Sequence, residues 1–208
     1  MSFHVSRRVA AIAPLALLAA TPLFAHVTGD AVHSRNSFAS GLAHPIGGLD
    51  HVLAMVAVGL WSAQLAKGAS SKWSLWALPA AFPIVMALGA GLGMAGIGLP
   101  LVEVAIALSA VVLGAMVLME AKPGLWMAGG LVAFFALFHG HAHGAELPAG
   151  ASALGYAAGF VLATVALHAT GIAMGMLNKW PAGERALRAG GGLVAAGGAA
   201  FLVMAFMG

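Results

Sequence analysis

WSLWALPAAFPIVMALGAGLGM, from Trp73 to Met94, decides the fold class of this chain. The stretch contains no Asp, Glu, Lys, Arg or His, and it exceeds the roughly 20 residues that an α-helix needs to cross a bilayer. Water is absent from the bilayer core, so a spanning segment must satisfy its own backbone hydrogen bonds, and a long continuous apolar run does so as a helix. We therefore predict a transmembrane helix over residues 73–94.

Five more apolar stretches of this kind lie on either side of it. They run over Leu49–Leu65, Leu99–Met119, Leu125–Gly140, Gly150–Leu177 and Ala186–Met207. Hydrophobic residues make up 62% of the chain and charged residues only 7%, far from the balance of a soluble domain. The prediction is an all-α, polytopic transmembrane bundle with one six-helix domain over residues 44–208. The stretches beginning at Leu49 and Leu125 are short, and both adjoin segments rich in glycine and histidine, so we expect a break or re-entry there.

The N-terminus is typical of a secretory signal peptide. Arg7 and Arg8 precede an apolar run from Val9 to Phe24, and a small residue, Ala25, closes it. This order of charged, apolar and small-residue segments predicts a signal peptide over residues 1–25, cleaved after Ala25. The alternative is that the segment stays uncleaved as a first membrane anchor, because the cleavage site is imperfect. Residues 26–43 are then a periplasmic N-terminal segment.

Positive charge marks alternate loops. Lysine and arginine follow the first, third and fifth predicted spans and are absent after the second and fourth; the residues are Lys67, Lys72, Lys122, Lys179, Arg185 and Arg188. The positive-inside rule makes the loops that carry them cytoplasmic. The mature N-terminus and the C-terminus then lie in the periplasm, which agrees with a cleaved signal. The predicted location is the bacterial inner (plasma) membrane.

Composition excludes several classes of function. Cysteine is absent, which removes disulfides, iron–sulfur clusters and thiolate metal sites. The nine Lys and Arg residues form no basic stripe, so we do not predict nucleic acid as a partner. The predicted partner is the lipid bilayer. The motifs GxxxxGK[ST], GxSxG and HExxH are also missing, so we predict that the chain is not an enzyme. The many glycines favour close helix packing and are compatible with a homo-oligomer.

The segment AHPIGGLDH, residues 43–51, is the first candidate site. Pro45 and the two glycines indicate a turn or helix start, and Asp50 falls in the first turn, where the helix dipole favours a carboxylate. His44 and His51 can then reach one ion, with Asp50 as a ligand or as the partner that fixes a histidine tautomer. Ionisable groups in a membrane are costly, so they favour a functional interpretation.

The segment FHGHAHGAE, residues 138–146, is the second. On a helix, His139 and His143 share one face while His141 points away; on an extended segment all three align. Glu146 follows at the same end. A histidine-rich external loop without a ligand is the alternative, but the first candidate site lies at the same predicted membrane depth. The two together predict a divalent-metal site near the periplasmic face.

Three further residues are candidate metal ligands. Glu103 lies near the outer end of the third predicted span and is a candidate ligand. His168 lies deep in the fifth span, in the inner half, as a second station or a structural histidine. His26 becomes the N-terminal residue if the signal is cleaved after Ala25, and its amine and imidazole could chelate a metal, although a mobile terminus is the simpler interpretation.

The two histidine segments together resemble the HupE/UreJ family of nickel permeases. His44, Asp50 and His51 match the family pattern H-x5-D-H, and residues 138–146 match F-H-G-x-[A/V]-H-G-x-E through Phe138, His139, His143 and Glu146. The stretches LVEVAIALSAVVLG and GYAAGFVLATVALHATGIAMG also look like the family. The resemblance implies six helices after a cleaved signal. It also implies a permease domain that takes up Ni²⁺, or Co²⁺, for hydrogenase or urease maturation.

The resemblance also ranks the candidate ligands. His141 occupies the variable position of the second pattern, and Glu103 lies where the third helix of the family has a glutamate. The predicted metal ligands are His44, Asp50, His51, Glu103, His139, His143 and Glu146, and the weaker candidates are His26, His141 and His168.

We expect secondary or facilitated permeation of the ion, which is substrate and not a permanent cofactor. A membrane-embedded metallohydrolase with Glu103 or Glu146 as base, and a haem-binding electron-transfer subunit with paired histidines, are the alternatives.

Overall fold

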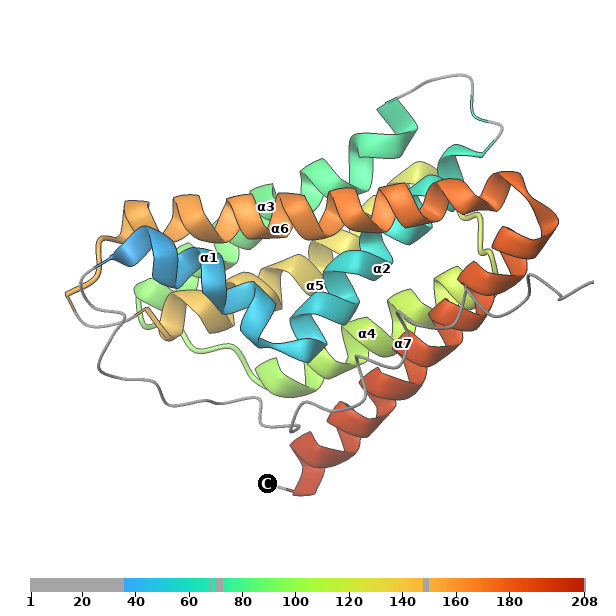
Figure 1. Ribbon diagram of the computed structural model, residues 1–208. Helices are drawn as coiled ribbons and strands as arrows, with labels where there is room; N and C mark the ends of the chain where they lie inside the picture. The colour runs from blue at the N-terminus through green and yellow to red at the C-terminus, as the bar shows by residue number, and fades with distance from the viewer. Residues whose placement is uncertain (1–35, 68, 70–72, 148–149, 208) are drawn as a thin grey trace, which may run out of the picture.

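The computed structural model of this chain describes residues 36–67, 69, 73–147 and 150–207, all of whose regular elements are helices (Figure 1). The elements are α1 (Ser37–Gly47), α2 (Leu49–Ala66), α3 (Trp73–Met94), α4 (Val102–Leu118), α5 (Leu125–Ala145), α6 (Ala153–Gly175), the 3-10 helix η2 (Met176–Lys179) and α7 (Pro181–Met207). The predicted all-α helical bundle is confirmed. The predicted signal peptide and His26 lie outside the described residues.

The first predicted span is a broken helix that begins earlier than the sequence indicated. Asn36 caps α1, its side chain accepting a hydrogen bond from the Ala39 backbone N–H at 3.1 Å. Pro45 lies in the last turn of α1, and Gly48 is extended, with φ −98° and ψ 113°. A Cβ at Gly48 would stand 2.8 Å from His51 Nδ1 and 2.9 Å from Asp50 Oδ1. The expected break is confirmed at Gly48, directly against the first histidine segment.

The other boundaries shift for local reasons. α5 continues beyond the predicted end at Gly140 to Ala145, so all three histidines of the second segment are helical and the break expected there is wrong. α4 is shorter than predicted, with 17 residues, because the helix begins only after Pro100 and after Leu101, whose φ is 57°. Within the described residues, five helices are long and apolar enough to cross a membrane, and α4 is a sixth, shorter apolar helix.

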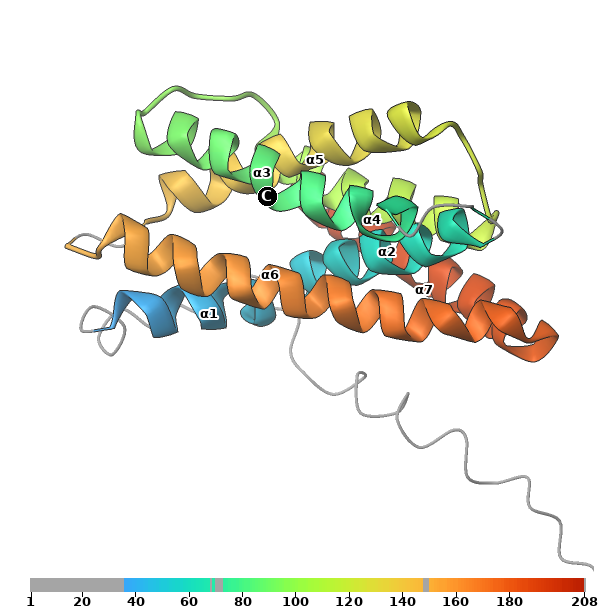
Figure 2. The same cartoon turned by 90° about the horizontal axis from the view of Figure 1, so that it is seen from above.

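Among the described helices, four pairs pack closely, as Figures 1 and 2 show: α3 with α5, α6 with α2, α6 with α1, and α4 with α7. Viewed from above, α3 and α5 lie on one side of the bundle, and α1 and α6 on the other. Glycine brings the α3–α5 pair together: a Cβ at Gly140 would collide with the Met86 carbonyl, and one at Gly89 with the Leu137 carbonyl. Small residues allow this approach where lipid offers no hydrophobic drive for helix association.

Gly140→Ala is expected to destabilise the protein strongly, because the new methyl would overlap backbone atoms of α3 and a helix would have to move. Overpacking of this kind costs about 2–3 kcal/mol. The corresponding fall in Tm is about 5–10 °C for a chain of this size. Gly130→Ala, on the same helix with nothing within 4 Å of its Cβ, is the matched control and should leave Tm unchanged or raise it. Thermal unfolding in detergent measures both, and equal Tm values would contradict the packing argument.

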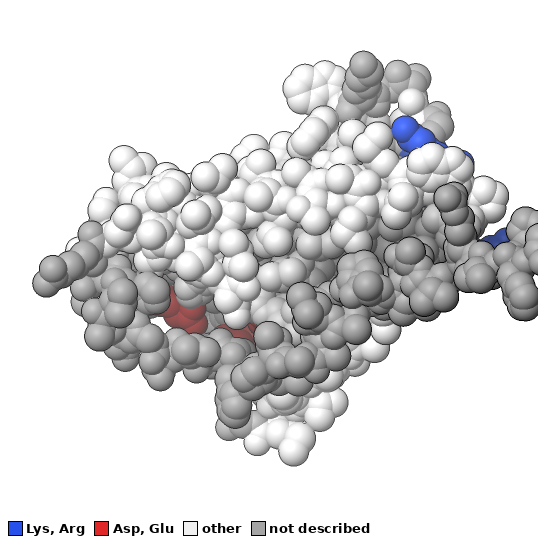
Figure 3. Space-filling view, in the orientation of Figure 1, with Lys and Arg blue, Asp and Glu red and all other residues white. Residues whose placement is uncertain are grey.

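The two ends of the bundle differ in charge. Lys67 Nζ pairs with Glu184 Oε1 at 3.1 Å, and Arg188 Nε donates to the Leu118 carbonyl at 3.0 Å, so α2, α4 and α7 meet at the basic end. On the face shown in Figure 3, basic atoms lie toward the end where α6 meets α7, and acidic atoms lie toward the other end. This arrangement agrees with the predicted orientation, in which the lysine and arginine loops share one side.

Candidate metal centre

The two histidine segments meet at the end of the bundle opposite the lysines. The break at Gly48 places His44 in the last turn of α1 and Asp50 in the first turn of α2. α5 ends beside them, with His143 in its last turn and Glu146 as its C-terminal cap. In an unbroken helix, His44 and His51 would lie on one straight helix. The break lets them approach α5 from two separate helices.

The outer part of the cluster consists of His44, His143 and Glu146. Each offers one ligand atom, and these atoms all lie within 4.8 Å of one another. His44 Nε2 lies 3.6 Å from Glu146 Oε2. A first-row metal holds nitrogen and oxygen at about 2.1 Å, so opposite ligands stand roughly 4.2 Å apart. Small side-chain rotations would therefore close this trio on one ion.

Exposure falls inward from this trio. The side chains of His44 and Glu146 are 33% and 43% exposed, while His143 is 4% exposed as a residue. The trio is therefore open on one side and closed on the other, as the mouth of a pathway requires.

Asp50 fixes the orientation of His51. Asp50 Oδ1 accepts hydrogen bonds from the His51 backbone N–H at 2.9 Å and from His51 Nδ1 at 2.8 Å. With Nδ1 as the donor, Nε2 is the nitrogen that carries the lone pair. His51 Nε2 is buried and has no hydrogen-bond partner in the part of the chain that the structure describes. Asp50 thus acts on this imidazole in the way that carboxylates orient metal-binding histidines.

His139 and His143 complete a row of imidazoles. The His51 ring lies 4.7 Å from the His143 ring and 5.1 Å from the His139 ring, between centroids. His139 Nδ1 bonds the Phe135 carbonyl at 2.9 Å, which leaves its Nε2 as the acceptor nitrogen. Within the described residues, His139 Nε2 and both nitrogens of His143 are buried without a partner. A buried polar atom without a partner costs about 1–3 kcal/mol, and a metal ion would satisfy His139 Nε2 and one nitrogen of His143.

Three predicted residues lie apart from this cluster. His141 points away, as expected for a helix, and its Nε2 bonds the Ile97 carbonyl at 2.7 Å. Glu103 is exposed in the first turn of α4, and within the described residues no contact joins it to the imidazoles. His168 lies further inside, beyond Phe82. The structure therefore groups His44, Asp50, His51, His139, His143 and Glu146, and it does not bring Glu103 among them.

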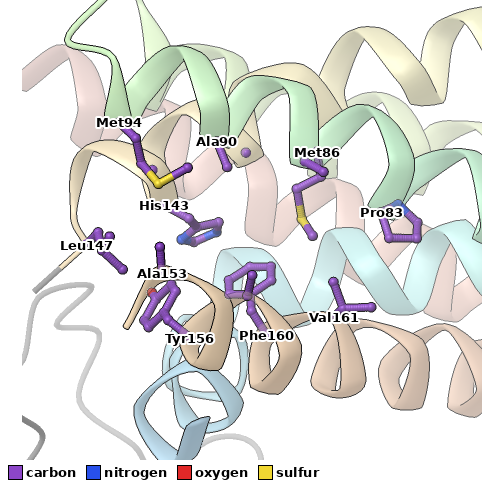
Figure 4. Close-up of a pocket in the computed structure, with 14 residues that line it drawn as sticks. Pro83, Met86, Ala90, Met94, His143, Leu147, Ala153, Tyr156, Phe160 and Val161 are labelled. Atoms are coloured by element: carbon purple, nitrogen blue, oxygen red, sulfur yellow. The ribbon is translucent and has the colours of Figure 1, made fainter. Parts of the chain in front are cut away.

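Aromatic residues that sequence reasoning missed surround the cluster. Phe160 lies 4.3 Å from the His143 ring, and Tyr156 lies 5.9 Å from the His44 ring. Both stand on α6 one turn apart, and this helical spacing is the signal that could have found them. With His143, Met86 and Met94 they line a cavity of about 80 Å³ between α3, α5 and α6 (Figure 4). It has room for several water molecules beside His143.

Comparison with known proteins identifies the family of this chain. The family described as HupE / UreJ protein matches residues 14–201, which include both histidine segments. The chain belongs to the HupE/UreJ family. A relative, Protein HupE of Rhizobium leguminosarum bv. viciae, is 51% identical over 164 residues, covering 79% of this chain and 83% of the relative. No solved structure gives a significant match. Family membership and the long apolar helices make this chain a membrane protein.

Proposed function

We propose that this protein carries Ni²⁺, or Co²⁺, across the bacterial inner membrane into the cytoplasm. The observation that carries the proposal is the row of buried imidazole nitrogens without partners, next to two carboxylates, at the end of the bundle opposite the lysines. Membership of the HupE/UreJ family supports a role in nickel or cobalt transport and favours it over hydrolysis.

The donor set suits such an ion. Imidazole nitrogen and carboxylate oxygen are ligands that Ni²⁺ and Co²⁺ accept, and no thiolate is present to favour softer metals. The half-exposed trio of His44, His143 and Glu146 would replace part of the hydration shell, and the buried nitrogens of His51 and His139 would take the ion inward. Ligands must release the ion as well as bind it, and several weak stations in a row allow both.

The predicted orientation supports uptake as the direction of transport. The cluster lies away from Lys67 and Arg188, so the positive-inside rule favours the periplasmic side for it and for both mature termini. Transport is secondary or facilitated, because the sequence carries no nucleotide-binding loop. The metal delivered to the cytoplasm would serve maturation of a hydrogenase or urease.

Uptake of radiolabelled Ni²⁺ in cells without other nickel importers tests the proposal. His143→Gln should lower the initial rate at least tenfold, because both of its nitrogens are buried within the cluster without another partner. His141→Gln on the same helix is the matched control, since His141 bonds the Ile97 carbonyl instead; it should keep most of the wild-type rate. Uptake by the wild type that equals that of cells without the protein would overturn the proposal.

A further inference from the structure

A second group of buried polar atoms lies deeper in the bundle than the metal centre. His168 is 1% exposed and Thr164 is 0% exposed, and they stand one turn apart on the same face of α6. Among the described residues, no hydrogen-bond partner reaches either ring nitrogen of His168 or the Thr164 hydroxyl. Burying such atoms in a membrane interior costs free energy, and the metal centre near α1 does not explain why they are there.

A backbone oxygen joins this group from α3. Pro83 has no N–H, so the Pro79 carbonyl lacks its usual donor within the helix. That carbonyl lies beside the His168 imidazole. Imidazole nitrogen, hydroxyl and carbonyl oxygen together form a neutral donor set of the kind that binds hydrated divalent cations weakly.

Phe82 separates this group from the metal centre. Its ring is 0% exposed and makes edge-to-face contacts with His139 at 5.5 Å and with His168 at 5.2 Å. The phenyl ring therefore bridges the innermost imidazole of the outer cluster and the first imidazole beyond it. It offers the ion no ligand and excludes water from the gap.

The depth of His168 fits a station between the two ends. Its backbone lies against Gly59 of α2. Gly59 is about 12 Å along α2 from His51 and about 12 Å from Lys67, at 1.5 Å per residue. His168 is thus midway between the metal centre and the basic end.

We propose that His168, with Thr164 and the Pro79 carbonyl, forms an inner binding station for the transported divalent cation, and that the Phe82 ring is the gate between this station and the outer cluster. The proposal rests on the proposed transport function. The ion leaves His139, the phenyl ring turns aside, and the ion is taken up by His168 on the cytoplasmic side of the gate.

Thiol accessibility tests it, because the natural chain has no cysteine. His168→Cys should react with a charged, membrane-impermeant thiol reagent in inverted vesicles but not in right-side-out vesicles. Ni²⁺ alone, added before the reagent, should slow the reaction at least fivefold. Adding Phe82→Ala should make the same thiol reactive from both sides. If His168→Cys does not fold, Thr164→Cys replaces it, with the same expectations.

His168→Gln separates a ligand from a structural residue. The glutamine amide still offers a donor to the Pro79 carbonyl but is a poor metal ligand. We expect a Tm close to that of the wild type, a transport rate at least tenfold lower, and unchanged binding of radiolabelled Ni²⁺ at the outer cluster.

Two results would contradict the inner station without contradicting the proposed transport function. One is transport at the wild-type rate by His168→Gln. The other is that, with Phe82 replaced, no reagent reaches a thiol at residue 168 or at residue 164 from either side of the membrane. His44→Cys should react only from the outside and be protected by Ni²⁺. Failure of that control, with no uptake by the wild type, would instead contradict the proposed function.

Discussion

Asp50→Asn is expected to reduce Ni²⁺ uptake to the level of cells without the protein. Asp50 Oδ1 holds both the backbone N–H and the Nδ1 of His51, so its charge fixes which nitrogen of His51 faces the cluster. An asparagine placed with its amide nitrogen toward Nδ1 would favour the opposite tautomer and direct a proton, instead of a lone pair, at the ion. The substitution also removes a negative charge beside a divalent cation, in a site that is largely closed to water.

Asp50→Asn should therefore lose both binding and transport, with at least a hundredfold rise in the Kd for Ni²⁺ in detergent. The loss of an orienting carboxylate alone costs about 10–100-fold in metal affinity, and the lost charge adds to it. Glu184→Gln removes a carboxylate at the basic end, where it pairs with Lys67, and is the matched control; its uptake should stay within twofold of the wild type. Normal Ni²⁺ affinity in Asp50→Asn would contradict the role assigned to this carboxylate.

The sequence predicted the membrane fold because lipid leaves the backbone few choices. An apolar run longer than a bilayer span, such as residues 73–94, must form a helix, and α3 has the predicted bounds. Boundaries were less accurate where proline and glycine act locally. Pro100 delays the start of α4, and α1 begins at Ser37, inside a segment that composition alone marked as polar. In this segment, the packing of α1 against α6 outweighs local helix propensity. This tertiary contact cannot be read from the sequence.

The site was predicted in part, for a physical reason that differs from residue to residue. His139, His143 and Glu146 were expected together because they lie at one helix end. His44, Asp50 and His51 were also expected together, and the break at Gly48 brings them to the same place from α1 and α2. Glu103 was expected among them on its depth and on the resemblance to the family. Depth places a residue along the membrane normal and says nothing of its position around the bundle, and α4 packs mainly against α7 and α2. Phe82 was not predicted, because a single aromatic residue in a span gives no signal until its neighbours are known.

His139→Leu is expected to stop transport while leaving an ion bound at the mouth. Leucine fills most of the volume of the imidazole in a site that is 0% exposed, and the lost bond to the Phe135 carbonyl costs only about 1 kcal/mol. The fold should therefore persist. His44, His143 and Glu146 remain within reach of one ion, but the nitrogen that receives the ion next to Phe82 is gone.

We expect the transport rate of His139→Leu to fall at least thirtyfold, with a Kd for Ni²⁺ within about threefold of the wild type. Each tenfold change in rate corresponds to about 1.4 kcal/mol, so the loss of one metal–imidazole contact is sufficient for such an effect. Equilibrium binding of radiolabelled Ni²⁺ to purified protein and initial uptake in proteoliposomes give the two numbers. His141→Leu is the control on α5, because the His141 imidazole points away from the cluster and faces Ile97. It should change neither the transport rate nor the Kd for Ni²⁺ by more than about twofold. If His139→Leu lost binding and transport in equal measure, His139 would belong to the mouth, and the ion would have no separate buried station before the phenyl gate.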